Sequence, residues 1–106
     1  MEPKPAMSSF SSFAEFYPFY LSEHSNRSCR RLHFIGSSLV LLTLVAVLAT
    51  GRWWGFWLMP LFGYGFAWVG HYFFEKNRPA TFIHPLYSLM GDWVMYRDIL
   101  IGRIGF

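Results

Sequence analysis

Four histidines are the residues of this chain that could most readily act together in chemistry. They stand at positions His24, His33, His71 and His84. Imidazole is a common ligand of iron, zinc and copper. Two or three imidazoles with a carboxylate and an open position form the arrangement in which non-haem Fe(II) enzymes bind oxygen. The histidines therefore predict a metal site, provided that the fold brings them together.

Two charged residues that follow the third histidine are candidate catalytic groups. Glu75 comes four residues after His71, so a regular α-helix would place both on one face. Arg78 carries a guanidinium group, which can bind a carboxylate through two parallel hydrogen bonds. Arg78 is therefore a candidate clamp for any ligand that carries a carboxylate, and we expect Glu75 or His84 to complete or support the metal shell.

Each of these residues also has an ordinary structural explanation. A histidine at a helix end often binds only a carbonyl or a lipid headgroup, and Glu75 could belong to a solvated charge cluster with Arg78. His84 lies in an expected loop and is the histidine most easily explained as incidental. Cys29 is expected to be inert. The sequence contains no nucleophile elbow, phosphate-binding glycine loop or HExxH motif, so the histidines carry its one chemical signal.

The composition indicates an integral membrane protein. Hydrophobic residues make up 54% of the 106 residues and charged residues 14%, whereas a soluble domain carries about 25% charged residues. A soluble domain of this length could not bury 12 Phe, 6 Tyr and 5 Trp. A lone cysteine excludes an intramolecular disulfide. The net charge of +3 is concentrated beside apolar runs, so we expect no nucleic-acid partner.

Two uncharged runs predict a transmembrane helical hairpin. They cover residues 32–50 and 53–74, and Gly51 and Arg52 form the turn between them. At about 1.5 Å per residue, each run can cross a hydrocarbon layer of roughly 30 Å. We expect Pro60 to kink the second span. The fold class is therefore all-α and integral to the membrane.

The flanking segments predict helices that lie at the membrane surface. Aromatic residues at helical spacing begin at Phe10, with Ser8 or Ser9 as the cap and Pro18 causing a break or a kink. Residues 82–106 are apolar but interrupted by charges, which is typical of an amphipathic helix. Residues 1–9 are expected to be a disordered tail, and residues 10–106 a single membrane domain.

The distribution of basic residues predicts the orientation. Arg52 alone lies at the turn, and the other end of the hairpin carries five basic residues: Arg27, Arg30, Arg31, Lys76 and Arg78. The excess of positive charge places both termini on the cytoplasmic side of a membrane, which we expect to be the bacterial inner membrane. An antiparallel hairpin also brings His33 and His71 to one depth in the membrane. His24 lies in the segment that enters the membrane and His84 in the segment that leaves it, so both are expected at the same face.

Two stretches and a short motif resemble a known family. They are FYPFYLSEHSNRSCRRLHFIGS (residues 16–37), GYGFAWVGHYFFEKNRPATF (residues 63–82) and the pair Gly91-Asp92. These stretches resemble the Mpo-like membrane family, long catalogued as a domain of unknown function. Its fungal members are Fe(II)-dependent dioxygenases of the endoplasmic reticulum that shorten 2-hydroxy fatty acids by one carbon, using O2.

The resemblance implies an iron site and an activity. It implies Fe(II) ligation by His24, His33 and His71, whereas it assigns no role to His84. It implies a membrane-bound dioxygenase with fatty-acyl and O2 substrates, in contact with membrane lipid. The chain is shorter than the fungal relatives, so a homo-oligomer could be needed to build the substrate site. The alternative is a non-catalytic membrane scaffold whose histidines only stabilise a turn; a transporter subunit is less favoured, because the spans carry no charge.

Overall fold

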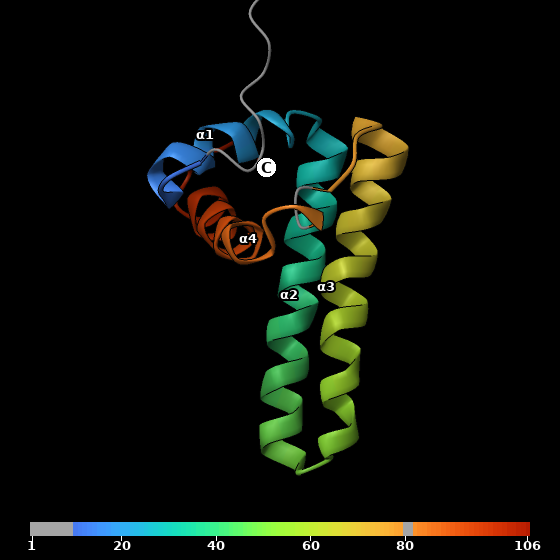
Figure 1. Cartoon of the computed structure of the whole chain (residues 1–106). Helices are drawn as coiled ribbons and strands as arrows, with labels where there is room; N and C mark the ends of the chain where they lie inside the picture. The colour runs from blue at the N-terminus through green and yellow to red at the C-terminus, as the bar shows by residue number, and fades with distance from the viewer. Residues whose placement is uncertain (1–9, 80–81) are drawn as a thin grey trace, which may run out of the picture.

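The computed structural model describes residues 10–79 and 82–106, and every regular element in these ranges is helical. The tail predicted to be disordered, residues 1–9, lies outside the described residues. Two long helical segments run antiparallel, side by side, and two shorter helices lie across one end of them (Figure 1). The all-α architecture expected from the sequence is therefore confirmed.

The first long segment is α2, Arg27–Thr50. It begins after Asn26, whose side-chain oxygen accepts hydrogen bonds from two backbone N–H groups of the first turn. It ends at Gly51, which has a φ of 68° and forms a left-handed cap. The uncharged run predicted a start at Leu32, but the Asn26 cap starts the helix more than one turn earlier. The basic residues before the run therefore lie inside α2.

The second long segment consists of three helical pieces. They are the 3-10 helix η2, Trp53–Trp57; the α-helix α3, Leu58–Val69; and the π-helix η3, Gly70–Glu75. Pro60 lies in the first turn of α3, where the missing N–H group costs no helical hydrogen bond. The change of helix type comes before this proline, so Pro60 marks the start of α3 and does not interrupt a long α-helix.

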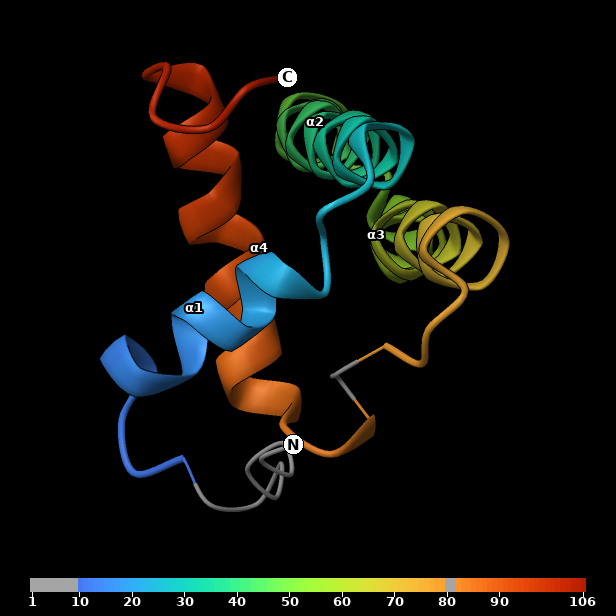
Figure 2. The same ribbon diagram turned by 90° about the horizontal axis from the view of Figure 1, so that it is seen from above.

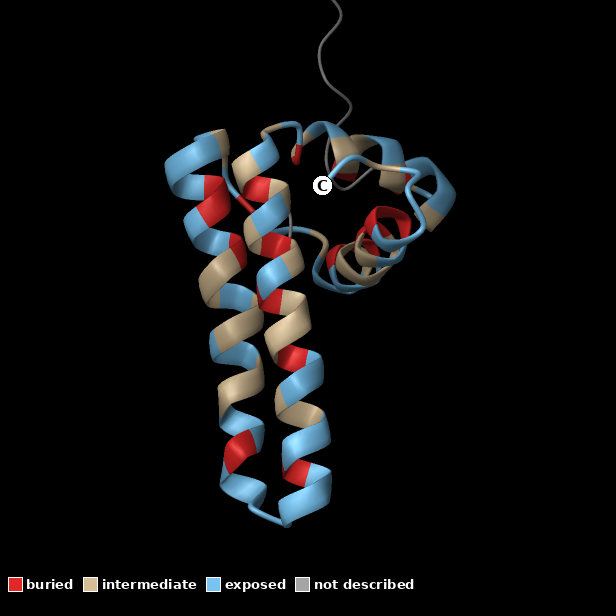
Figure 3. Cartoon of the chain, turned by 180° about the vertical axis from the view of Figure 1, so that it is seen from behind, coloured by how far each residue is buried: buried red, intermediate tan, exposed pale blue. Residues whose placement is uncertain are grey.

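Near the turn at Gly51 and Arg52, the hairpin leaves much apolar surface exposed. Figure 3 shows that burial concentrates where the shorter helices meet the hairpin, and that the end near the turn is mostly exposed. Seven large side chains there are more than 60% exposed: Leu42, Val45, Leu48, Trp53, Trp54, Trp57 and Leu61.

The hairpin shape is confirmed, but two membrane spans are not. Within the described residues, α2 is the one helix long and apolar enough to cross a bilayer. The pieces of the second segment are each shorter than a span requires. The second span therefore stays a prediction.

The two shorter helices are α1, Phe13–Ser22, and α4, Pro85–Leu100. Seen along the hairpin axis, they extend sideways from it, with α1 passing over α4 (Figure 2). The core between them is formed by four residues: Phe16, Tyr20, Met95 and Ile99. The helices predicted before and after the hairpin in the chain are thus present, and they pack against each other.

The start of α1 differs from the expectation. Ser12 caps the helix by accepting a hydrogen bond from the Glu15 N–H at 3.2 Å. The expected caps, Ser8 and Ser9, lie outside the described residues. Pro18 remains inside one continuous helix because it lies on the exposed side, while the buried side holds the helix against α4.

The two long segments come very close together at Gly36. A Cβ atom at this position would lie 2.8 Å from the carbonyl oxygen of Phe62 and 2.9 Å from Cβ of Phe66. Real Cβ atoms essentially never approach backbone oxygen so closely, so any larger residue must push α2 and α3 apart.

Gly36→Ala should therefore destabilise the fold. We expect a loss of about 1–3 kcal/mol in the free energy of unfolding, the usual cost of overpacking, measured by thermal or denaturant unfolding in detergent. Gly65→Ala is the matched control, because a Cβ at Gly65 meets no atom within 4 Å. It should leave stability unchanged or raise it by up to about 1 kcal/mol through helix propensity. Equal melting curves for the two variants would contradict the close approach.

Candidate metal centre

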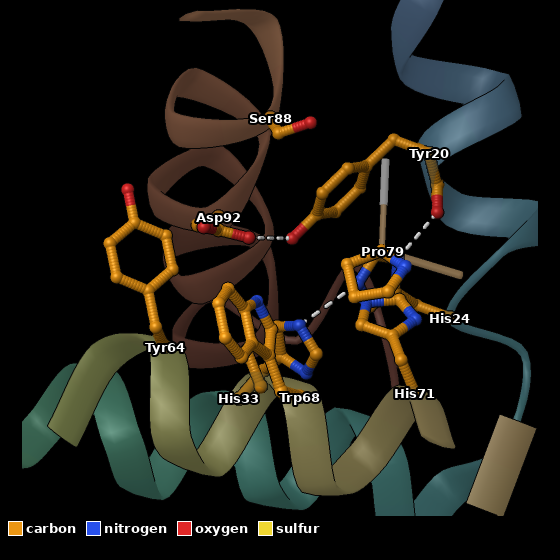
Figure 4. A pocket seen from close by; sticks show the side chains of 10 residues that line it. Tyr20, His24, His33, Tyr64, Trp68, His71, Pro79, Ser88 and Asp92 are labelled. Atoms are coloured by element: carbon orange, nitrogen blue, oxygen red, sulfur yellow. Dashed lines mark hydrogen bonds between the residues drawn. The ribbon is translucent and has the colours of Figure 1, made fainter. Parts of the chain in front are cut away.

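Three histidines from three segments of the chain meet at the end of the hairpin that carries α1 and α4. His24 lies in the loop after α1, His33 in the second turn of α2, and His71 in the π-helix η3. Their exposed fractions are 1%, 6% and 3%. The ring centroids are 4.4 Å apart for His24–His33 and His24–His71, and 5.0 Å apart for His33–His71 (Figure 4).

Each of the three rings is held through its Nδ1 atom by an oxygen acceptor. Nδ1 of His24 lies 2.6 Å from the Tyr20 carbonyl oxygen, and Nδ1 of His33 lies 2.9 Å from the Cys29 carbonyl oxygen. A carbonyl oxygen can only accept, so Nδ1 carries the proton in both rings. In a neutral imidazole, Nε2 then carries an unshared electron pair.

The third ring follows the same pattern through Asn77. The Asn77 side-chain amide nitrogen donates to the carbonyl oxygen of Glu23 at 3.1 Å, which assigns the amide orientation. Its Oδ1 atom therefore accepts from Nδ1 of His71, at 2.7 Å. Nε2 of His71 is left with an unshared electron pair too.

This arrangement brings the unshared electron pairs of the Nε2 atoms together in the buried interior. Nε2 of His24 and Nε2 of His33 are 3.0 Å apart, and neither carries a hydrogen when the rings are neutral. A proton between them is disfavoured, because burial first, and the neighbouring His33 and His71 second, hold the pKa of His24 well below its usual range. A metal cation fits this donor set, since histidine ligands characteristically bind through one ring nitrogen while the other donates to a carbonyl or amide oxygen.

Cys29 supplies a fourth potential donor. The Cys29 Sγ atom and one ring nitrogen from each of the three histidines all lie within 4.8 Å of one another. The thiol lies 3.7 Å from Nδ1 of His33. The sequence alone predicts an inert Cys29. Once α2 starts at Arg27, the spacing of four between Cys29 and His33 puts both on one face.

The π-helix brings His71 close to α2. A Cβ at Gly70 would lie 2.9 Å from the Cys29 Sγ atom, so only glycine permits this approach. Lys76 then adopts a left-handed conformation with a φ of 57°. The reversal lets the backbone N–H of Asn77 donate to the carbonyl oxygen of His71 at 3.0 Å, which brings the Asn77 side chain back to the ring.

Tyr20 connects the cluster to α4. Its ring stacks on His24, with centroids 4.0 Å apart, and its hydroxyl donates to a carboxylate oxygen of Asp92 (Figure 4). Tyr20, Asp92 and Ser88 line a cavity of about 20 Å³ together with the three histidines. Ser88 is 4% exposed, and its hydroxyl has no hydrogen-bond partner among the described residues. The cavity has room for one small group with polar atoms.

The other predicted site residues lie outside the cluster. His84 precedes α4 and packs against aromatic rings, with centroids 5.5 Å from those of Phe10 and Phe16. The exposed Arg78 stacks its guanidinium over Phe82, at 5.1 Å.

Glu75 is not among the potential metal donors of the cluster. It accepts a hydrogen bond from the backbone N–H of Asn26, and another from the Ser25 hydroxyl at 3.3 Å. These two hydrogen bonds hold the carboxylate on the loop between α1 and α2, so it is engaged there and not with the potential metal donors.

Asp92 gives the site a dependence on pH. Burial raises the pKa of Asp92 from 3.8 to about 7, although the hydrogen bond from Tyr20 lowers it in part. Between about pH 4 and pH 7, the folded protein therefore retains a proton on Asp92 that the unfolded chain releases. Protonation of Asp92 thus stabilises the fold fully below about pH 4, and this stabilisation is lost as the pH rises through about 7.

Raising the pH from 5 to 8 should therefore destabilise the wild type more than Asp92→Asn, whose amide oxygen can still accept from Tyr20. The difference should be about 3 kcal/mol, because about two of the pH units between 5 and 8 lie below the raised pKa, and each contributes 1.36 kcal/mol. Denaturant unfolding of both proteins in the same metal-free detergent buffer measures it. Parallel stability–pH curves would contradict the raised pKa of Asp92.

Comparison with known proteins gives one match. A family model described as "2-hydroxy-palmitic acid dioxygenase Mpo1-like" matches residues 10–104, a range that includes all the described helices and the three clustered histidines. Searches of curated proteins and of solved structures gave no significant match.

Proposed function

The chain belongs to the Mpo1-like family, and we propose that it is a membrane-bound, Fe(II)-dependent dioxygenase acting on 2-hydroxy fatty acids. The observation that carries the proposal is the convergence of Nε2 atoms that have no proton of their own. His24 and His33 bring theirs to 3.0 Å, with both Nδ1 atoms already bound to carbonyl oxygens. A cluster that only stabilised a turn would gain nothing from opposing two unshared electron pairs.

The residues that would hold the metal are His24, His33 and His71, with Cys29 as the nearest further donor. Imidazole and thiolate donors suit iron, zinc and copper alike. The family description favours iron, because a dioxygenase requires a redox-active centre and zinc has no redox chemistry. Bound iron would supply the centre at which O2 is reduced and the hydroxy acid is oxidised.

The proposed overall reaction balances without a further reductant. A 2-hydroxy acid and O2 give the acid with one carbon fewer, CO2 and water. The bond between the carboxyl carbon and the carbinol carbon breaks, and the carbinol carbon becomes the new carboxyl carbon. The substrate loses four electrons, and O2 accepts all four.

The protein's own residues would orient the substrate and exclude water. Ser88 offers a hydroxyl that has no partner among the described residues, so it is available to a ligand oxygen inside the cavity. The Tyr20 hydroxyl is already engaged by Asp92, so these two residues would fix the wall opposite the histidines. The near-complete burial of the three rings keeps bulk water away from the reacting atoms.

Glu75 would support the metal shell without binding the metal. Its carboxylate accepts hydrogen bonds from Ser25 and from the backbone of Asn26, which directly follow His24 in the chain. This contact ties the loop that carries His24 to the end of the π-helix that carries His71. Arg78, at the exposed rim, would attract the substrate carboxylate toward the site.

We further propose that lipid covers the exposed apolar part of the hairpin. In the apolar window of α2, only 28% of the residues are buried, whereas a core helix of a soluble protein would be mostly buried. Basic residues gather at the histidine end and exposed tryptophans at the other, which favours a cytoplasmic site. A homo-oligomer within the membrane is compatible with this exposure.

Iron binding is the first test. Protein purified anaerobically in detergent should contain about one iron per chain and consume O2 when given 2-hydroxyhexadecanoic acid. His33→Ala and His71→Ala should lose both properties, because each removes a ligand. His84→Ala is the control and should retain both, since His84 lies outside the cluster. The alternative of a non-catalytic scaffold predicts no metal in the wild type, and that result would overturn the proposal.

Asn77 should increase the affinity of the site for iron without itself binding the metal. Asn77→Ala removes the acceptor that fixes the tautomer and orientation of His71. Loss of such a partner typically lowers metal affinity by about 10–100-fold. Titration with Fe(II) against a competing chelator measures the change. An affinity equal to that of the wild type would mean that the bond between Asn77 and His71 does not support the site.

A further inference from the structure

A second cavity lies beside the histidine cluster, where α2, α3 and α4 meet. Its volume is about 230 Å³, and its walls are mostly apolar. Three residues line both this cavity and the small one at the histidines: His33, Tyr64 and Asp92. The two cavities are therefore neighbours with a common wall, and we refer to the larger one as the groove.

The groove extends along the hairpin, away from the metal ligands. On α2, Ser37 and Val40 follow His33 at spacings of four and three, so the three share one face. On the antiparallel α3, Gly63 and Met59 continue in the same direction from Tyr64. Among the described residues, Asp92 is the one carboxylate that lines the groove, and no lysine or arginine lines it. The groove is thus polar where it meets the cluster and apolar beyond it.

This polarity matches a molecule with an acidic head and a hydrocarbon tail. We propose that the groove binds the acyl chain of the substrate, with the head at the histidines, and that Gly63 keeps the groove open. The inference rests on the proposed function, which it extends by assigning a binding site to the tail. At roughly 30 Å³ per small group, the groove holds about eight methylene-sized groups. A longer chain continues past Met59 into the lipid.

Gly63 controls the width of the groove because it has no side chain to fill it. A Cβ added there would meet only the Cγ2 atom of Val40, at an ordinary contact distance of 3.5 Å. A leucine at this position would therefore extend into the groove without a backbone clash.

Gly65 is the matched control, two residues along the same helix. A Cβ there meets nothing within 4 Å, and the residue lines a different cavity, together with Leu32 and Phe66. Gly65→Leu adds the same volume and hydrophobicity to α3 but leaves the groove unchanged.

The test compares the wild type, Gly63→Leu and Gly65→Leu in detergent. A 2-hydroxyhexadecanoic acid that carries a photoactivatable diazirine near carbon 7 is cross-linked to each protein, and the labelled peptides are identified by mass spectrometry. We expect labels on groove peptides in the wild type and Gly65→Leu, and at least a tenfold loss of them in Gly63→Leu. Labelling that Gly63→Leu does not reduce, or labels spread over the outer faces of the hairpin, would overturn the inference.

A second measurement separates this inference from the proposed function. O2 consumption is recorded with 2-hydroxy acids of 4, 8, 12 and 16 carbons. Gly63→Leu should lose activity at least tenfold on the longer acids while retaining it on the 4-carbon acid, and Gly65→Leu should keep the wild-type profile. If Gly63→Leu consumes O2 with the same dependence on chain length as the wild type, the groove does not bind the acyl chain, but the proposed enzymatic activity stands. If the wild type consumes no O2, the proposed function fails, and the cross-linking alone decides where the chain binds.

Discussion

Three hydrogen bonds donated by ring Nδ1 atoms determine the geometry of the histidine cluster, and the rest of the fold supplies their acceptors. The acceptor for His24 is a carbonyl oxygen of α1, that for His33 a carbonyl oxygen of α2, and that for His71 the amide oxygen of Asn77. Each bond fixes a tautomer as well as an orientation. Because all three leave Nε2 unprotonated, the cluster favours a cation over a network of hydrogen bonds.

Much of the hairpin and part of the cluster could be predicted from the sequence. The turn at Gly51 and the two apolar runs imply an antiparallel pair, which brings His33 and His71 to one level whatever the details of packing. His24 follows because the chain enters the hairpin at that end. These inferences need only the direction and length of helices, which apolar runs encode locally.

The rest of the site depends on contacts that no local pattern encodes. Tyr20 and Asp92 are separated by 72 positions, and their pairing requires α1 to lie on α4. Cys29 joins the cluster because a cap at Asn26 extends α2, a signal that the sequence contains but that the uncharged run concealed. Glu75 binds Ser25 and Asn26, about 50 positions earlier in the chain, and helical periodicity cannot reveal such a pairing.

The groove is bounded by α2, α3 and α4, and Pro60 at its wall is exposed on the face that the proposed bilayer would cover. An insoluble acid could then enter sideways from the lipid, without first dissolving in water. The acid would reach the protein by diffusing within the plane of the membrane. The rate of encounter would then depend on the lateral diffusion of the acid and on its amount per area of membrane. The shortened product would return to the same phase. Its dilution by surrounding lipid, and not its solubility in water, would limit how strongly it competes for the site.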